Sequence, residues 1–347
     1  MKEEYKKEID YLNKSPIYAM SLGSKELFHS NFWAWMIEKY PCFAKVFFEN
    51  LDDNILVKRE EKHRDITIWK GDEAYVIENK LKSIPTKDQL ERYTKDLGNK
   101  FKSGILTGLV SPNFDLKGIN WDFISYSGIE EKISEILSNN EIEMDDFYKS
   151  ILEEYCGIIK RISKIIVGLL SKGDDDSFFI ADKHTLDKLK TIRLDDVYKK
   201  LISSKFIEYF KNKNNSISEK LTISQDYSRG DAIMDFKIEN GDDSIGVQIQ
   251  GNKFKILAER KKLNCHNELF NKYKDCEWFG EYDTLNKKIF HKATNRKNEY
   301  NKYSGKTSFV YQYFILDDKI KFSELEEEIK KYLRKACGIS ENDRKSI

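Results

Sequence analysis

The sequence lacks several features that would assign it quickly to a class of protein. No apolar run approaches the roughly 18 residues of a membrane-spanning helix, and no secretory signal is visible. The five cysteines are scattered and include no Cys-x-x-Cys pair. That usage argues against a disulfide scaffold and favours reduced thiols. We therefore expect a cytoplasmic protein that does not associate with membranes.

An excess of charge of one sign is also missing. The 347 residues include 60 Lys and Arg against 59 Asp and Glu, so the formal net charge is only +1. Without a global basic field, any nucleic-acid binding must use local patches. One such patch comprises Lys58, Arg59, Lys62, His63 and Arg64, continued by Lys80, Lys82 and Lys87. Charges this dense occur along the whole chain, so the patch alone is a weak signal.

The most informative stretch runs from residue 64 to residue 93. After a predicted strand over residues 55–63, alternation from Asp65, a Gly-containing turn and an apolar run over residues 74–77 predict a hairpin. Side chains alternate along a strand, so Glu78 and Lys80 project from one face. Antiparallel pairing then places Asp65, Glu78 and Lys80 together at one end of a sheet.

Two carboxylates and a lysine in one place are suited to the hydrolysis of a phosphodiester. Carboxylate oxygens are hard ligands that bind Mg²⁺, which also keeps waters and takes phosphate oxygens. The metal lowers the pKa of a bound water, and a lysine can hold that water or stabilise the pentavalent anion. In a chain that is 34% charged, an isolated Glu-x-Lys is usually a solvated strand edge. The hypothesis therefore depends on the whole arrangement.

An amphipathic helix follows the hairpin, with Gln89 and Tyr93 on one face. With this helix, the stretch resembles the core of the PD-(D/E)XK nuclease superfamily, here as Asp65…Glu78-Asn79-Lys80. Residues 89–93 resemble the Gln-x-x-x-Tyr motif of the exonuclease-like branch of that superfamily. Arg64 stands where the superfamily pattern has proline, a departure that is frequent among its members.

The resemblance implies a bacterial, metal-dependent nuclease that hydrolyses phosphodiester bonds of nucleic acid, with DNA favoured as the substrate. Asp65 and Glu78 would bind Mg²⁺ or Mn²⁺, and the backbone carbonyl of Asn79 would be a further ligand. Lys80 would position or activate water. The resemblance also implies that Gln89 and Tyr93 orient the site or contact the substrate strand.

A helix is predicted over residues 24–36, with Ser24 as its N-cap. Its opening, Ser-Lys-Glu-Leu-Phe-His-Ser-Asn, resembles the helix before the sheet in one family of these nucleases. A glutamate on that helix often approaches the metal, and Glu26 is the matching residue, with His29 behind it. The alternative is that Glu26 is a surface acid favoured by the helix dipole.

We expect an α/β fold, with a mixed-sheet PD-(D/E)XK nuclease core of αβββαβ order over residues 1–128. Such a sheet can bury both of its faces under helices. A helical segment is predicted over residues 129–215 and an α+β region over residues 216–347. In that region Asp235 and Gln248 repeat the spacing of Asp65 and Glu78. The repeat predicts either a degenerate second nuclease-like hairpin or an unrelated hairpin with the same turn chemistry.

Two alternatives to an autonomous nuclease remain open. The chain could be a catalytically silent nucleic-acid-binding subunit that keeps the nuclease fold, or it could cut only with a protein partner. The near-neutral charge favours dependence on a partner or a homodimer, since autonomous duplex binding needs several phosphate contacts. The resemblance associates such nucleases with antiviral defence against foreign DNA, with repair or with restriction.

Overall fold

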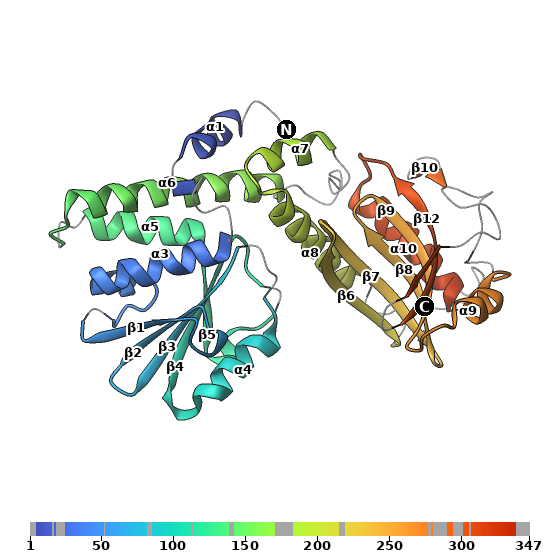
Figure 1. Ribbon diagram of the computed structural model, residues 1–347, viewed down its shortest axis with the longest axis horizontal. Helices are drawn as coiled ribbons and strands as arrows, with labels where there is room; N and C mark the ends of the chain where they lie inside the picture. Colours follow the sequence, from blue (N-terminus) through green and yellow to red (C-terminus); the bar gives the residue numbers. More distant parts are fainter. Residues whose placement is uncertain are drawn as a thin grey trace. The chain divides into compact units, whose positions relative to one another are not determined.

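The chain divides into two compact units, each with its own β-sheet (Figure 1). The computed structural model describes residues 5–15, 17–18, 25–51, 53–81, 85–112, 114–138, 142–170, 183–214, 219–276, 279, 290–293, 301–304 and 307–337. The first unit comprises Met1–Ser171 and Lys188–Val197, and the second Lys172–Asp187 and Tyr198–Ile347. The predicted α/β class is confirmed, while the three-part division at residues 128 and 215 stays a prediction.

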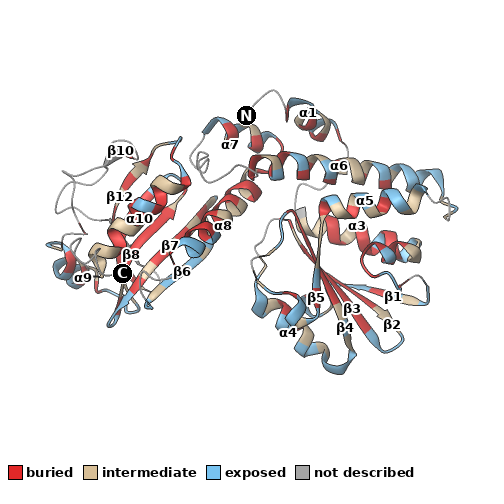
Figure 2. Cartoon of the chain, turned by 180° about the vertical axis from the view of Figure 1, so that it is seen from behind, coloured by how far each residue is buried: buried red, intermediate tan, exposed pale blue. Residues whose placement is uncertain are grey.

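The first unit is built on a five-stranded mixed sheet in the order β1-β2-β3-β4-β5. Its strands are β1 (Ile55–Arg59), β2 (Ile66–Lys70), β3 (Glu73–Lys80), β4 (Phe101–Gly108) and β5 (Trp121–Ser125). β1, β2 and β3 pair antiparallel, whereas β4 pairs parallel with both β3 and β5. Nearly all of β3 is buried, as expected for a central strand with both faces covered (Figure 2).

Helices cover both faces of this sheet (Figure 1). α4 (Lys87–Leu97) lies on one face, in a core that includes Val76, Leu90 and Trp121. On the other side are α3 (Lys25–Lys39), α5 (Tyr126–Ser138) and α6 (Asp146–Leu170), with α1 (Lys6–Lys14) against α6. The short 3₁₀ helices are η2 (Pro41–Val46), η4 (Gly98–Lys100) and η5 (Lys117–Ile119), whereas η3 (Glu61–His63) is a turn in which Lys62 and His63 have positive φ. The N-cap predicted at Ser24 lies outside the described residues.

The strand predicted over residues 55–63 is shorter than expected. β1 ends at Arg59 because it pairs antiparallel with β2, so the chain must reverse between them. The reversal is closed by a hydrogen bond from the Glu60 N–H to the Asp65 carbonyl oxygen (3.2 Å). Asp65 consequently precedes β2 instead of opening it.

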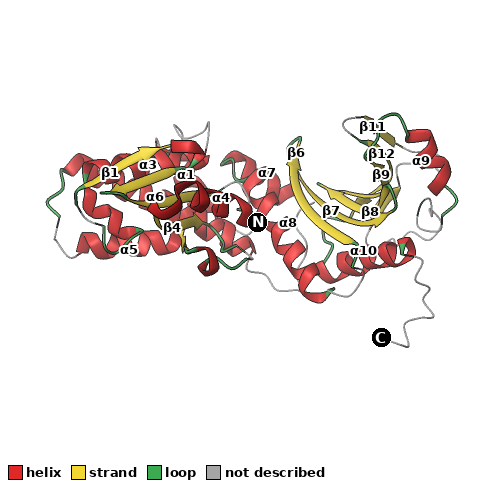
Figure 3. Cartoon of the chain, turned by 90° about the horizontal axis from the view of Figure 1, so that it is seen from below, coloured by secondary structure: helices red, strands yellow, loops and turns green. Residues whose placement is uncertain are grey.

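The second unit contains an antiparallel sheet in the order β10-β12-β9-β8-β7-β6, with β11 also paired to β12. Its strands are β6 (Leu221–Ser228), β7 (Asp231–Asn240), β8 (Asp243–Gln250), β9 (Lys253–Arg260), β10 (Phe290–Ala293), β11 (Asn301–Ser304) and β12 (Ser308–Leu316). Its helices are α9 (His266–Tyr273), α10 (Phe322–Ala336) and most of α8 (Asp195–Lys213). Both α7 (Lys183–Thr191) and α8 contain residues of the two units. α8 and α10 pack on one face of the sheet, where Phe206 and Phe210 contact Phe236 (Figure 3).

The β7–β8 hairpin shares its register and turn with the β2–β3 hairpin. Asp235 pairs with Gln248, and the turn glycines Gly71 and Gly241 both have left-handed φ angles, 60° and 65°. The similarity ends there. β8 continues into antiparallel β9, whereas β3 crosses through α4 to parallel β4.

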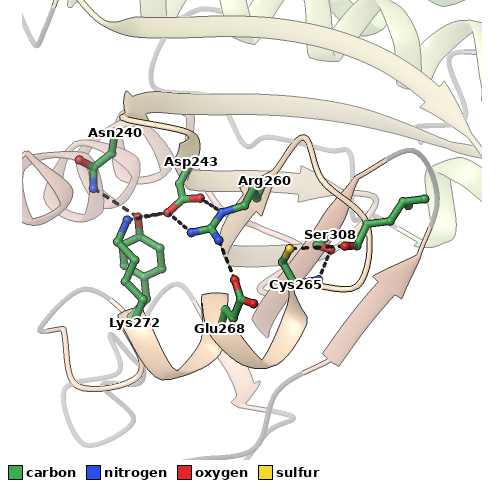
Figure 4. A network of polar contacts seen from close by, with 9 residues as sticks. Asn240, Asp243, Arg260, Cys265, Glu268, Lys272 and Ser308 are labelled. Atoms are coloured by element: carbon green, nitrogen blue, oxygen red, sulfur yellow. Dashed lines mark hydrogen bonds and ion pairs between the residues drawn. The ribbon is translucent and has the colours of Figure 1, made fainter.

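A buried carboxylate joins α9 to one end of the central strands β8 and β9 of the second sheet (Figure 4). The Asp243 side chain is 0% exposed. It accepts hydrogen bonds from Arg260 Nε (2.6 Å) and Nη2 (3.2 Å), Lys272 Nζ (2.7 Å) and the Tyr273 hydroxyl (2.9 Å). Burial alone would raise the pKa of Asp243, but these donors outweigh it and hold the pKa at about 2.

We predict that Asp243→Asn destabilises the second unit by about 2 kcal/mol at pH 7, because the neutral amide loses the charge-assisted hydrogen bonds that the buried carboxylate accepts from Arg260 and Lys272. The carboxylate is charged in both states above its unfolded pKa of about 3.9. Its contribution is lost as the pH falls from there towards 2, so the wild type and the variant should converge below about pH 4. Urea unfolding by circular dichroism measures this difference. Asp242→Asn, at an exposed neighbouring position, is the control, and an equal loss in both variants would contradict the prediction.

Candidate functional site

The β2–β3 hairpin brings two predicted acids face to face at one end of the first sheet. Ile66 pairs with Ile77, so Asp65 and Glu78 continue the same register. The Asp65 N–H donates to Glu78 Oε2 (3.4 Å), and the Asn79 N–H donates to Asp65 Oδ2 (2.7 Å). Backbone groups of the hairpin therefore orient both carboxylates.

Lys80 projects from the same face as Glu78, as strand alternation predicted. Its Nζ lies 2.8 Å from Glu78 Oε1, and the two side chains are only 11% and 2% exposed. Burial lowers the pKa of Lys80, but the charge of Glu78 more than compensates, so the pKa is raised overall. Lys80 is therefore a cation at neutral pH.

Asp65 and Glu78 carry more potential negative charge than the single nearby lysine, Lys80, can neutralise. Burial, followed by repulsion from Glu78, raises the pKa of Asp65 to about 7. Burial also raises the pKa of Glu78, although Lys80 opposes that shift. One lysine thus faces two carboxylates, one buried and one partly buried, and a further positive charge at this position would relieve their repulsion.

The first turns of α4 direct Gln89 and Tyr93 towards the same acids. Gln89 Nε2 donates to Glu78 Oε1 (3.0 Å) and to the Tyr93 hydroxyl oxygen (2.8 Å). The Tyr93 hydroxyl donates in turn to the His63 carbonyl oxygen (2.6 Å). The pair therefore links Glu78 to the turn that precedes Asp65.

The Asn79 side chain lies on the opposite face of β3, in a network that the sequence did not reveal. Its Nδ2 donates to the Glu26 carbonyl oxygen (3.2 Å), and its Oδ1 accepts from Thr107 Oγ1 (2.9 Å) and from the Tyr126 hydroxyl. These contacts join β3 to α3, β4 and α5. The N–H and C=O of a strand residue point to the same side, so the Asn79 carbonyl is directed towards Asp65, as its N–H is.

Glu26 lies in the first turn of α3. After burial, the larger cause, its charge contributes to the raised pKa values of Asp65 and Glu78. Among the described residues, however, no group of three or more His, Cys, Asp or Glu side chains is arranged to hold a metal ion. A direct role of Glu26 in metal binding therefore stays a prediction.

His29 belongs to the core and not to the site. Its Nδ1 lies 3.0 Å from the Tyr155 hydroxyl oxygen, and burial lowers its pKa to about 3. The imidazole is therefore neutral at physiological pH. Its ring packs against Tyr126 and Tyr155, which explains its position behind Glu26 without a chemical role.

Comparison of the chain with protein-family models, curated proteins and solved structures gave no match. Among the helices that the structure describes, none is long and apolar enough to span a membrane. Only the geometry and chemistry of the site itself therefore bear on the function.

We predict that Asn79→Leu lowers the stability of the first unit by about 2 kcal/mol, because the buried hydroxyls of Thr107 and Tyr126 lose their acceptor. Urea-dependent hydrogen exchange in peptides from β3 and β4 measures the change locally. Asn99→Leu, at an exposed position of the same unit, is the control. Unchanged protection in the Asn79 variant would show that the network does not hold β3 in place.

Proposed function

We propose that the chain is a metal-dependent nuclease of the PD-(D/E)XK kind, which hydrolyses phosphodiester bonds of nucleic acid, with DNA as the favoured substrate. The observation that carries the proposal is the meeting of Asp65, Glu78 and Lys80 at one end of the β2–β3 hairpin. The order of helix, three strands, helix and strand in the first unit is also that of the PD-(D/E)XK core. Defence against foreign DNA and repair are the roles that the resemblance suggests.

The donor set at this site suits Mg²⁺ or Mn²⁺. Mg²⁺ is commonly held by one or two carboxylates, with waters and substrate phosphates completing its coordination. Asp65 and Glu78 would hold the ion together with the Asn79 carbonyl, and its charge would relieve the repulsion that contributes to the raised pKa of Asp65. When bound, it would lower the pKa of a water and offset charge that develops on the phosphorus.

Lys80 acts in this proposal as a cation and not as a base. Its raised pKa keeps the ammonium protonated, so it can hold the attacking water or stabilise the pentavalent anion. Gln89 fixes the orientation of the Glu78 carboxylate by donating to Oε1. Tyr93 is a positioning residue, because it reaches the site only through Gln89 and the His63 carbonyl.

We predict that the purified protein cuts DNA in Mg²⁺ or Mn²⁺ but not in EDTA, and that Lys80→Ala lowers the rate at least about 100-fold by removing charge stabilisation. Circular and linear substrates, single- and double-stranded, separate endonuclease from exonuclease action. Lys102→Ala removes a lysine that is 55% exposed in the same sheet and should leave the rate unchanged. No cutting by folded protein would favour the silent or partner-activated alternatives.

Metal binding should strengthen as the pH rises through about 7, because Asp65 has a pKa of about 7 and must lose its proton to bind. Calorimetric titration of Mn²⁺ in two buffers of different ionisation enthalpy measures the released proton at pH 6 and pH 8. Asp65→Asn should abolish binding, while Asp72→Asn, in the exposed turn of the hairpin, should not. Equal affinity of wild type and Asp65→Asn would exclude this residue as a ligand.

A further inference from the structure

The turn between β1 and β2, residues 60–63, has an unusual backbone for its composition. Glu60, Lys62 and His63 have left-handed φ angles of 51°, 52° and 68°. Residues with side chains seldom adopt this region, whereas glycine enters it without cost. None of these three residues is glycine, so their side chains make the left-handed backbone of the turn strained. Strain of this kind persists only where surrounding contacts maintain it.

Glu61 is the internal anchor of the turn. Its carboxylate accepts hydrogen bonds from Lys58 Nζ (3.1 Å), Arg64 Nη2 (3.2 Å) and Trp69 Nε1 (3.2 Å). The Arg64 side chain is 1% exposed and also donates to Thr67 Oγ1 (3.1 Å). Lys58 and Arg64, which the sequence placed in a basic patch, are therefore engaged within the protein.

The turn is also connected to the proposed active site. Its His63 carbonyl accepts the Tyr93 hydroxyl, which is linked through Gln89 to Glu78. Its Glu60 N–H donates to the carbonyl of Asp65 (3.2 Å). The strained turn is thus held at both ends, and each attachment leads to one of the two acids.

Lys62 and His63 remain directed to solvent. Both are exposed, and within the described part of the chain neither side chain forms a hydrogen bond or an ion pair. The contacts of Glu61 and the His63 carbonyl therefore hold the exposed Lys62 and His63 side chains in the turn that leads to Asp65. Of the rest of the patch, Arg59 lies 3.9 Å from Glu60, and Lys82 lies outside the described residues.

We propose that this turn contacts the phosphate backbone of the bound nucleic-acid strand through Lys62 and His63, an inference that rests on the proposed function. A lysine ammonium and imidazole N–H groups are donors that phosphate oxygens accept. A rigid turn beside Asp65 would place these donors on phosphates next to the scissile one. The near-neutral chain would thereby obtain local positive charge where the substrate lies.

The test replaces each strained residue by glycine, in Lys62→Gly, His63→Gly and Glu60→Gly. All three changes relieve left-handed strain, so each should raise Tm by about 2 °C. Lys62→Gly and His63→Gly should nevertheless weaken binding of a labelled oligonucleotide about fivefold, and Lys62→Gly should lower the salt slope by about one. Glu60→Gly is the matched control and should bind as tightly as wild type or tighter.

Binding is measured by fluorescence anisotropy in EDTA at several salt concentrations, and cleavage is measured separately in Mg²⁺. Weaker binding at higher Tm in the Lys62 and His63 variants alone supports the proposal. If the wild type cleaves and all three variants bind as it does, the turn is not a phosphate contact, although the nuclease assignment stands. A lower Tm in all three would also overturn the inference, because the turn would then not be strained. If the wild type neither binds nor cleaves, the proposed function fails and this inference fails with it.

Discussion

The opposition of two carboxylates, the partly buried Asp65 and the buried Glu78, is the constraint on which the rest of the first unit depends. Their register follows from the hairpin, and burial together with mutual repulsion raises the pKa of Asp65 to about 7. Lys80 compensates only one negative charge. Like charges in a low-dielectric site are costly unless a cation is shared between them. The pair is therefore a cost to the fold that an added cation, as proposed for this site, would reduce.

The scaffold holds this unfavourable pair from both faces of β3. On the α4 side, Gln89 donates to Glu78 and connects it through Tyr93 to the turn before β2. On the α3 side, Asn79 is satisfied by groups from two helices and a neighbouring strand. Glu78 is thus held by Gln89, and its neighbour Asn79 is held by buried hydrogen bonds. Contacts from helices and strands of this kind keep functional side chains in place more precisely than loops do.

The hairpin and the acid–acid–lysine grouping could be predicted because both follow from local rules. Alternation along a strand and the turn at Gly71 are sufficient to place Asp65, Glu78 and Lys80 together. The roles of Thr107 and Tyr126 could not be predicted, since they meet Asn79 only through the tertiary fold. The left-handed turn was misread as strand for a similar reason. Glu60 and Lys62 are residue types that seldom adopt positive φ. The contacts that hold the turn include Trp69 on Glu61 and Tyr93 on the His63 carbonyl, which only the tertiary fold supplies.

The β7–β8 hairpin has the same backbone arrangement as the β2–β3 hairpin but a different set of charged side chains. Asp235 pairs with Gln248 in the register that Asp65 and Glu78 continue in the first hairpin. Here, however, the Gln248 amide donates to Asp235 (2.8 Å), and Lys237 Nζ lies 3.2 Å from the same carboxylate. Lys237 also lies 2.8 Å from Glu259, so here the lysine and the Gln248 amide together balance two acids. Hairpin spacing and turn glycine therefore carry no function by themselves. What distinguishes the first hairpin is a carboxylate, Glu78, in place of the Gln248 amide, because its charge acts directly on Asp65 and raises the pKa of that acid.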